Sequence, residues 1–165
     1  MRSRGHYGET EPLPHAAVSL GSTPGVLRFS DTHTSEAQMK RVTGIGGIFF
    51  KAQDPVALAD WYKKHLGIDV QGGYAVFNWT DAAGHPTNGM TVWSIGPADS
   101  DHYAPSTASF MVNYRVDDLA ALLQALRDEG CNVLEKTDEA EFGKFGWVMD
   151  PEGNKVELWQ PPDEQ

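Results

Sequence analysis

The order of predicted elements occurs twice along the chain, and this internal repeat constrains the fold more than any other feature. Each half is predicted to run strand, helix, strand, strand, strand, over residues 42–96 and 108–161. With a shift of 64 positions, Asp54 falls on Asp118 and Leu58 falls on Leu122. Two copies of one supersecondary unit indicate a single domain that buries its core between two modules.

The first half begins with the short apolar run 44–52, which is typical of a strand. Asp54 is placed to cap a helix, and Pro55 stands at the first helical position, where a missing N–H costs least. Gly67 is placed to end that helix in the left-handed conformation. Three further strands are predicted over residues 68–70, 74–79 and 89–95, with a polar turn over 81–88.

The second half repeats this order. Residues 110–116 predict a strand, Asp118 is placed to cap a leucine-rich helix, and Gly130 is placed to end it. Within the segment 150–154, Pro151 sets φ and Gly153 accepts a positive φ, which predicts a tight hairpin turn. The remaining strands are predicted over residues 131–134, 145–149 and 155–159.

The first 38 residues differ from the rest of the chain. They are rich in Gly and Pro and keep no helical or strand period, so we predict a flexible N-terminal tail over residues 1–38. Met39 then leads directly into the first strand and is a candidate start of translation. The folded domain is predicted over residues 39–165.

Composition excludes several classes of protein. The formal net charge is −10, which disfavours a nucleic-acid partner because phosphate binding needs the opposite sign. No apolar run approaches the roughly 20 residues of a membrane span. Cys131 is the one cysteine, so no intrachain disulfide can form, and a cytoplasmic setting is expected.

Two stretches resemble the vicinal oxygen chelate superfamily, which includes glyoxalase I, extradiol dioxygenases and bleomycin-resistance proteins. They are the helix end Trp61-Tyr62…His65-Leu66-Gly67 and the turn 150–154 before an apolar strand carrying Glu157. The resemblance covers residues 44–160. It implies an α+β fold in which two βαβββ modules form a half-open, mixed-sheet barrel. It also implies a homodimer, with the modules paired within one chain or exchanged across the dimer.

The resemblance implies four positions for metal ligands, one on the first and one on the last strand of each half. Carried onto this chain, they are Gly47, Thr91, Met111 and Glu157. Glycine has no donor side chain, and a thioether is a poor ligand for hard divalent metals. We therefore expect no metal and no cofactor at these positions.

Acidic residues surround His102 in the linker between the halves, where Asp99 and Asp101 lie close in sequence. This cluster could reach the mouth of a cavity, or it could form a solvated linker. The residues favour the solvated linker. A solvated loop is likewise predicted for the acidic residues Asp138, Glu139 and Glu141.

Strand alternation predicts which side chains face the inside of the sheet. On the last strand, Val156 and Leu158 should face the helix, which leaves Glu157 and Trp159 facing inward. The same argument applied to the other strands predicts a cavity lined by Phe49, Thr91, Trp93, Met111, Asn113, Glu157 and Trp159. Trp147, with Phe142 and Lys144 just upstream, is placed to close one end. These side chains describe either a small-molecule site or a filled core.

Three functions are compatible with this sequence. The first is binding of a small organic molecule without the metal of the family, with aromatic walls and Glu157 favouring a flat or cationic ligand. The alternative is a glyoxalase-like lyase or isomerase, or a dioxygenase-like enzyme, that uses Glu157 as base or metal ligand. The third is a non-catalytic subunit.

Overall fold

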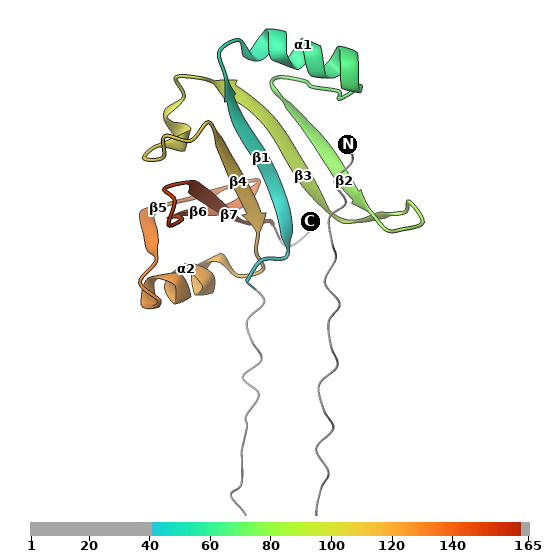
Figure 1. The fold of residues 1–165 in the computed structure, drawn as a ribbon. Helices are drawn as coiled ribbons and strands as arrows, with labels where there is room; N and C mark the ends of the chain where they lie inside the picture. The colour runs from blue at the N-terminus through green and yellow to red at the C-terminus, as the bar shows by residue number, and fades with distance from the viewer. Residues whose placement is uncertain (1–40, 163–165) are drawn as a thin grey trace, which may run out of the picture. The chain divides into compact units, whose positions relative to one another are not determined.

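A computed structural model describes residues 41–162, which form one seven-stranded mixed sheet with two helices (Figure 1). The strand order is β2-β3-β1-β4-β7-β6-β5, so β2 and β5 are the edges and the sheet is open. The elements in chain order are β1 (Gly44–Ala52), α1 (Pro55–Leu66), β2 (Tyr74–Thr80), β3 (Pro86–Pro97), the short 3₁₀ helix η1 (Asp101–Tyr103), β4 (Phe110–Arg115), α2 (Leu119–Asp128), β5 (Asn132–Ala140), β6 (Gly143–Met149) and β7 (Lys155–Gln160).

The two predicted modules are joined within one chain. In each module the first and last strands run parallel, β1 beside β3 and β4 beside β7. The antiparallel pair β1–β4 then joins the modules, with Phe49 opposite Met111. The α+β fold of two related modules is confirmed, and the pairing left open by the sequence is made within the chain.

The predicted strand over residues 68–70 is wrong. The Val70 amide bonds the carbonyl of Ile68, which makes a tight turn, and only an isolated bridge between Gln71 and Tyr74 follows. The first module therefore has three strands and the second has four. Two other boundaries also differ, because β3 begins at Pro86 and β5 continues to Ala140. Strand β5 thus includes Asp138 and Glu139, which the sequence had placed in a loop.

Matching caps hold the helices at equivalent places in the two modules. The Asp54 carboxylate accepts a hydrogen bond from the Ala57 amide at 2.9 Å, and the Asp118 carboxylate accepts one from Ala121 at 2.9 Å. Gly67 ends α1 at φ 68°, a left-handed conformation that favours glycine. These caps confirm the repeat at the level of individual hydrogen bonds.

The two helices differ in how they pack on the sheet. Helix α2 covers a buried apolar cluster of Val116, Leu119, Leu122, Leu123 and Leu158. Helix α1 contains no fully buried residue and contacts the sheet through aromatic rings. There the Tyr62 ring lies 4.7 Å from the Trp93 ring and 6.2 Å from the Phe50 ring. The main core therefore lies in the second module.

The predicted tail over residues 1–38 and the predicted start of the domain at Met39 lie outside the described residues. Between residues 41 and 162, no helix is long and apolar enough to cross a membrane.

Candidate functional site

The face of the sheet opposite the helices carries an apolar cavity of about 480 Å³. Strands of both modules supply its walls, and the loop between β5 and β6 supplies its rim. The side chains that line the cavity include Phe49, Val76, Val92, Asn113, Phe142, Phe145 and Trp159. None of the described residues that line this cavity is charged.

Trp159 is held in the wall by the loop between β5 and β6. Its indole Nε1 donates to the carbonyl of Phe142 at 2.8 Å. Gly143 has φ 116°, and a Cβ atom built there would collide with the backbone of Gln160 and with the indole. A glycine is therefore required for the loop to approach Trp159 this closely.

A second hollow of about 410 Å³ lies beside the first and contains the charged groups. Glu157 lines this hollow, whereas Phe49 and Phe145 line both spaces. The predicted single cavity is therefore two adjoining spaces. Phe49, Asn113 and Trp159 line the apolar cavity, where the sequence placed them, whereas Glu157 lines the adjoining hollow. Met111 is 0% exposed and packs against Tyr103 and Trp147.

The prediction that Thr91 and Trp93 face the cavity is wrong. The Trp93 ring packs 5.0 Å from the Phe50 ring on the side of α1. The Thr91 hydroxyl accepts from the indole of Trp79 at 2.9 Å and donates to a β1 carbonyl at 2.7 Å. Their neighbour Val92 lines the cavity instead.

The strand register explains this error. Phe49 pairs with Ser94 across β1–β3, and Asn113 pairs with Glu157 across β4–β7. Because the 64-residue shift carries Phe49 onto Asn113, the counterpart of Glu157 in the first module is Ser94. The sequence-based match of Thr91 with Glu157 is therefore wrong by three residues. An odd displacement assigns every side chain of β3 to the opposite face of the sheet.

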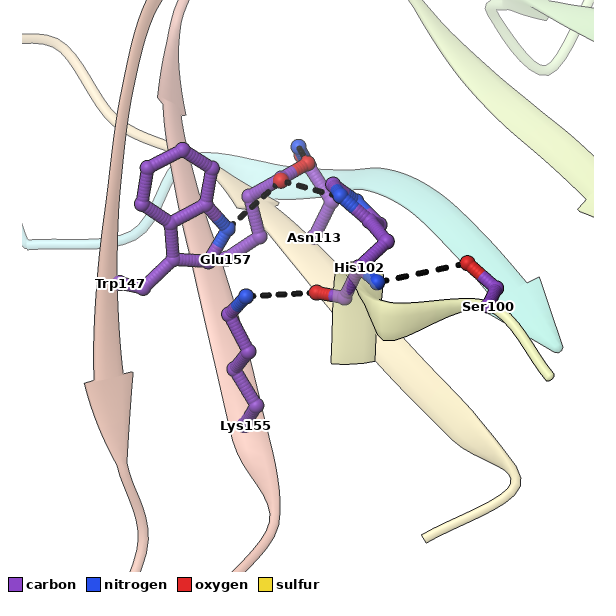
Figure 2. Close-up of polar contacts among 6 residues, drawn as sticks. All are labelled: Ser100, His102, Asn113, Trp147, Lys155 and Glu157. Atoms are coloured by element: carbon purple, nitrogen blue, oxygen red, sulfur yellow. Dashed lines mark hydrogen bonds and ion pairs between the residues drawn. The ribbon is translucent and has the colours of Figure 1, made fainter. Parts of the chain in front are cut away.

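Glu157 is a buried carboxylate, 4% exposed, with N–H donors on both oxygens (Figure 2). The side-chain amide of Asn113 donates to Oε1 at 2.7 Å, and the indole of Trp147 donates to Oε2 at 2.7 Å. His102 brings its Nε2 atom to 3.7 Å from Oε2. These contacts stabilise the ionised carboxylate away from water.

Asn113 is 3% exposed, and its Oδ1 atom has no hydrogen-bond partner within residues 41–162. Its Nδ2 is committed to Glu157, so its Oδ1 points the other way. A Cβ atom built on Gly46 would collide with this oxygen and with the ring of Trp159, so Oδ1 lies between these two residues at the cavity wall. A buried carbonyl oxygen without a donor is costly, which makes Oδ1 a candidate contact for a bound molecule.

The linker between the modules contributes to the second hollow. His102 and the buried Tyr103 belong to η1, and Lys155 Nζ donates to the His102 carbonyl at 2.6 Å (Figure 2). Burial lowers the pKa of Lys155, and burial together with the Glu157 charge raises the pKa of Tyr103. His102 is solvated, as the sequence favoured, with 52% of its side chain exposed, and it also reaches the second hollow, which the sequence had left as the alternative. Its sequence neighbours gave no signal that this turn folds back onto β7.

Comparison with known families explains the doubled architecture. Residues 47–159 match the family model described as a glyoxalase-like domain. The chain belongs to this family. The superfamily resemblance drawn from the sequence is thereby confirmed. No curated protein sequence matches the chain.

Solved structures with this glyoxalase-like fold include methylmalonyl-CoA epimerases. A variant of the Streptomyces coelicolor enzyme in complex with 2-nitronate-propionyl-CoA is 18% identical, with a TM-score of 0.54, and the match covers 73% of this chain and 98% of that one. A methylmalonyl-CoA epimerase in complex with methylmalonyl-CoA and ammonium is 17% identical, with a TM-score of 0.55 and coverage of 74% and 96%. A glyoxalase/bleomycin resistance protein/dioxygenase superfamily member from Vibrio splendidus 12B01 is 11% identical, with a TM-score of 0.49 and coverage of 72% and 98%. The epimerase matches show the fold alone.

The donor set of this glyoxalase-like domain does not fit a divalent metal. The register places Gly47, Met111, Ser94 and Glu157 at the four corresponding positions of the first and last strands. Of these four residues, Glu157 alone has a carboxylate, and one carboxylate is too few donors to hold such an ion. Among the residues from 41 to 162, no three His, Cys, Asp or Glu side chains gather in a way that could hold an ion.

Proposed function

We propose that this glyoxalase-like protein binds a small, flat organic molecule in the apolar cavity, without the metal of the family. One observation carries the proposal, the cavity of about 480 Å³ lined by Phe49, Phe145 and Trp159 on the face of the sheet opposite the helices. This volume lies within the range of known ligand pockets, and aromatic walls favour a flat ligand through stacking.

The charge expected of the ligand differs from that in the sequence-based hypothesis. Glu157 was expected to anchor a cationic ligand above aromatic walls. In the structure the carboxylate lies in the adjoining hollow, and its oxygens are committed to Asn113 and Trp147. The proposed ligand of the apolar cavity is therefore uncharged where it meets the walls.

An enzyme that uses Glu157 as base fits this geometry less well. A base needs an oxygen that its substrate can reach, whereas Glu157 is 4% exposed and both of its oxygens accept N–H bonds, from Asn113 and from Trp147. The contacts of Glu157 instead support a fixed, ionised group that organises its neighbours.

Filling the cavity from one wall tests this proposal. Val76 lines the cavity from β2, whereas the next residue, Phe77, points to the other face of the same strand and is 46% exposed. Val76→Trp should abolish binding of flat bicyclic compounds measured by titration calorimetry. Phe77→Trp is the matched control and should bind as the original protein does.

Two results would contradict the proposal. One is the absence of binding by any flat bicyclic compound in a screen at millimolar concentration. The other is equal binding by the Val76→Trp and Phe77→Trp variants, which would place the ligand outside this cavity.

A further inference from the structure

The contacts of Glu157 decide which end of the Asn113 amide faces the cavity. An ionised carboxylate only accepts hydrogen bonds, so the group 2.7 Å from Oε1 must be the NH₂ of Asn113 and not its oxygen. The indole of Trp147 fixes the other oxygen of the same carboxylate at 2.7 Å. The amide is thereby held in one of its two orientations.

The consequence appears on the cavity side of Asn113. Its Oδ1, which no group within residues 41–162 pairs, is buried beside Gly46 and the ring of Trp159, both of which line the apolar cavity. This oxygen is an acceptor without a donor among otherwise apolar walls. A ligand that brings an N–H or O–H to it would satisfy a group that the fold leaves unpaired.

We infer that Glu157 is a positioning residue that makes Asn113 the hydrogen-bond acceptor of the cavity, so that the ligand is a flat apolar molecule bearing an N–H or O–H donor. This inference rests on the proposed function, because it assigns the ligand chemistry of the same cavity. Glu157 then governs ligand choice through Asn113 without touching the ligand.

Three bicyclic compounds of nearly equal shape test the inference. Indole offers an N–H donor, indene offers neither donor nor acceptor, and benzoxazole offers a ring-nitrogen acceptor. Titration calorimetry on the full chain should show indole binding about tenfold more tightly than indene, and benzoxazole no more tightly than indene. Tenfold corresponds to about 1.4 kcal/mol, within the range for leaving a buried acceptor unpaired.

Glu157→Gln should reverse this preference. The Trp147 indole still requires an acceptor, so the new side chain must turn its carbonyl to the indole and its NH₂ to Asn113. Asn113 then offers its oxygen inward and turns its own NH₂ toward the cavity. Benzoxazole should gain about tenfold in affinity, and indole should lose about tenfold.

The matched control is Glu139→Gln, the same change at an exposed position of β5 outside both hollows. It should leave all three affinities unchanged. Amide spectra of ¹⁵N-labelled protein supply a readout that does not depend on binding. The Asn113 NH₂ resonances should shift in the Glu157→Gln variant and stay in place in the Glu139→Gln variant.

The outcomes separate the inference from the proposed function. If none of the three compounds binds the unchanged protein, both fail. If all three bind with equal affinity, the proposed function stands and the inference is overturned. An unchanged preference for indole in a folded Glu157→Gln variant would also overturn it.

Discussion

Trp147 and Glu157 lie directly opposite each other in the antiparallel pair β6–β7, and the indole of the first donates to the carboxylate of the second at 2.7 Å. The two side chains are 5% and 4% exposed. A buried carboxylate that loses such a donor keeps its charge and loses part of its stabilisation. Both residues therefore contribute to the stability of the fold as well as to the arrangement of the site.

Trp147→Phe should lower the free energy of unfolding by about 1–3 kcal/mol, because it leaves a buried charged acceptor with one donor fewer. Urea denaturation at neutral pH measures the change. Trp61→Phe is the control, since Trp61 is 50% exposed, and it should stay within about 0.5 kcal/mol. Equal effects of the two substitutions would contradict the prediction.

Trp93→Leu should destabilise the fold without changing ligand affinity. Trp93 packs between Phe50 and Tyr62, where it attaches α1 to the sheet, and it lies on the face away from the cavity. We expect a loss of about 1–3 kcal/mol in urea denaturation, since the smaller side chain leaves a gap among the rings. Calorimetric affinity for flat bicyclic compounds should remain within about twofold. A lost affinity in a folded variant would show that Trp93 takes part in binding.

The repeat and the helix caps could be predicted because they depend on local signals. Asp54, Asp118 and the turn over 150–154 can each be recognised from a few neighbouring residues. The inward face of β3 could not be predicted, because Met90 and Val92 are as apolar as Trp93 and Ile95, so alternation does not choose between the faces. Only the register of β3 against β1 determines which face of β3 lines the cavity.

The candidate site was predictable where one residue type stood out and not where tertiary folding brought residues together. Glu157 is a lone carboxylate in an apolar strand, so alternation alone placed it on the correct face. The position of His102 depends on how the linker folds back, which no local pattern encodes. The division into two hollows likewise depends on the tertiary positions of Phe49 and Phe145, which line both spaces.

Added Ni²⁺, Mn²⁺, Zn²⁺ or Fe²⁺ at micromolar concentration should leave the melting temperature unchanged. An ion that binds only the folded state would raise it, and Gly47, Ser94 and Met111 offer no suitable donors. Thermal unfolding with and without each ion measures the effect. One equivalent of metal retained through dialysis would contradict the prediction.

The hairpin turn after β6 should show a pH-dependent contribution to stability. Asp150 accepts hydrogen bonds from the amides of Glu152 and Asn154 and from the Asn154 side chain, and these lower the pKa of Asp150 below its ordinary value of 3.8. The ionised form is therefore favoured in the folded state. Its contribution is present above about pH 4 and is lost as the pH falls through the lowered pKa.

Asp150→Ala should therefore be less stable than the unchanged protein at pH 7, and the difference should shrink below about pH 4. Urea denaturation from acidic to neutral pH measures it. Asp60→Ala, an exposed position on α1, is the control. A difference that is independent of pH would show that the turn does not depend on the ionised carboxylate.

The pairing of β1 with β4 has a consequence for the chain while it is being synthesised. β1 is the first strand of the sheet, and one of its edges pairs with β3 while the other pairs with β4. On the ribosome, the second edge has no partner until residues 110–115 have emerged. Nascent chains shorter than this expose an unpaired strand edge, which is the kind of surface that recruits other strands. While the ribosome makes the linker and β4, this chain therefore exposes a strand edge that can recruit other strands.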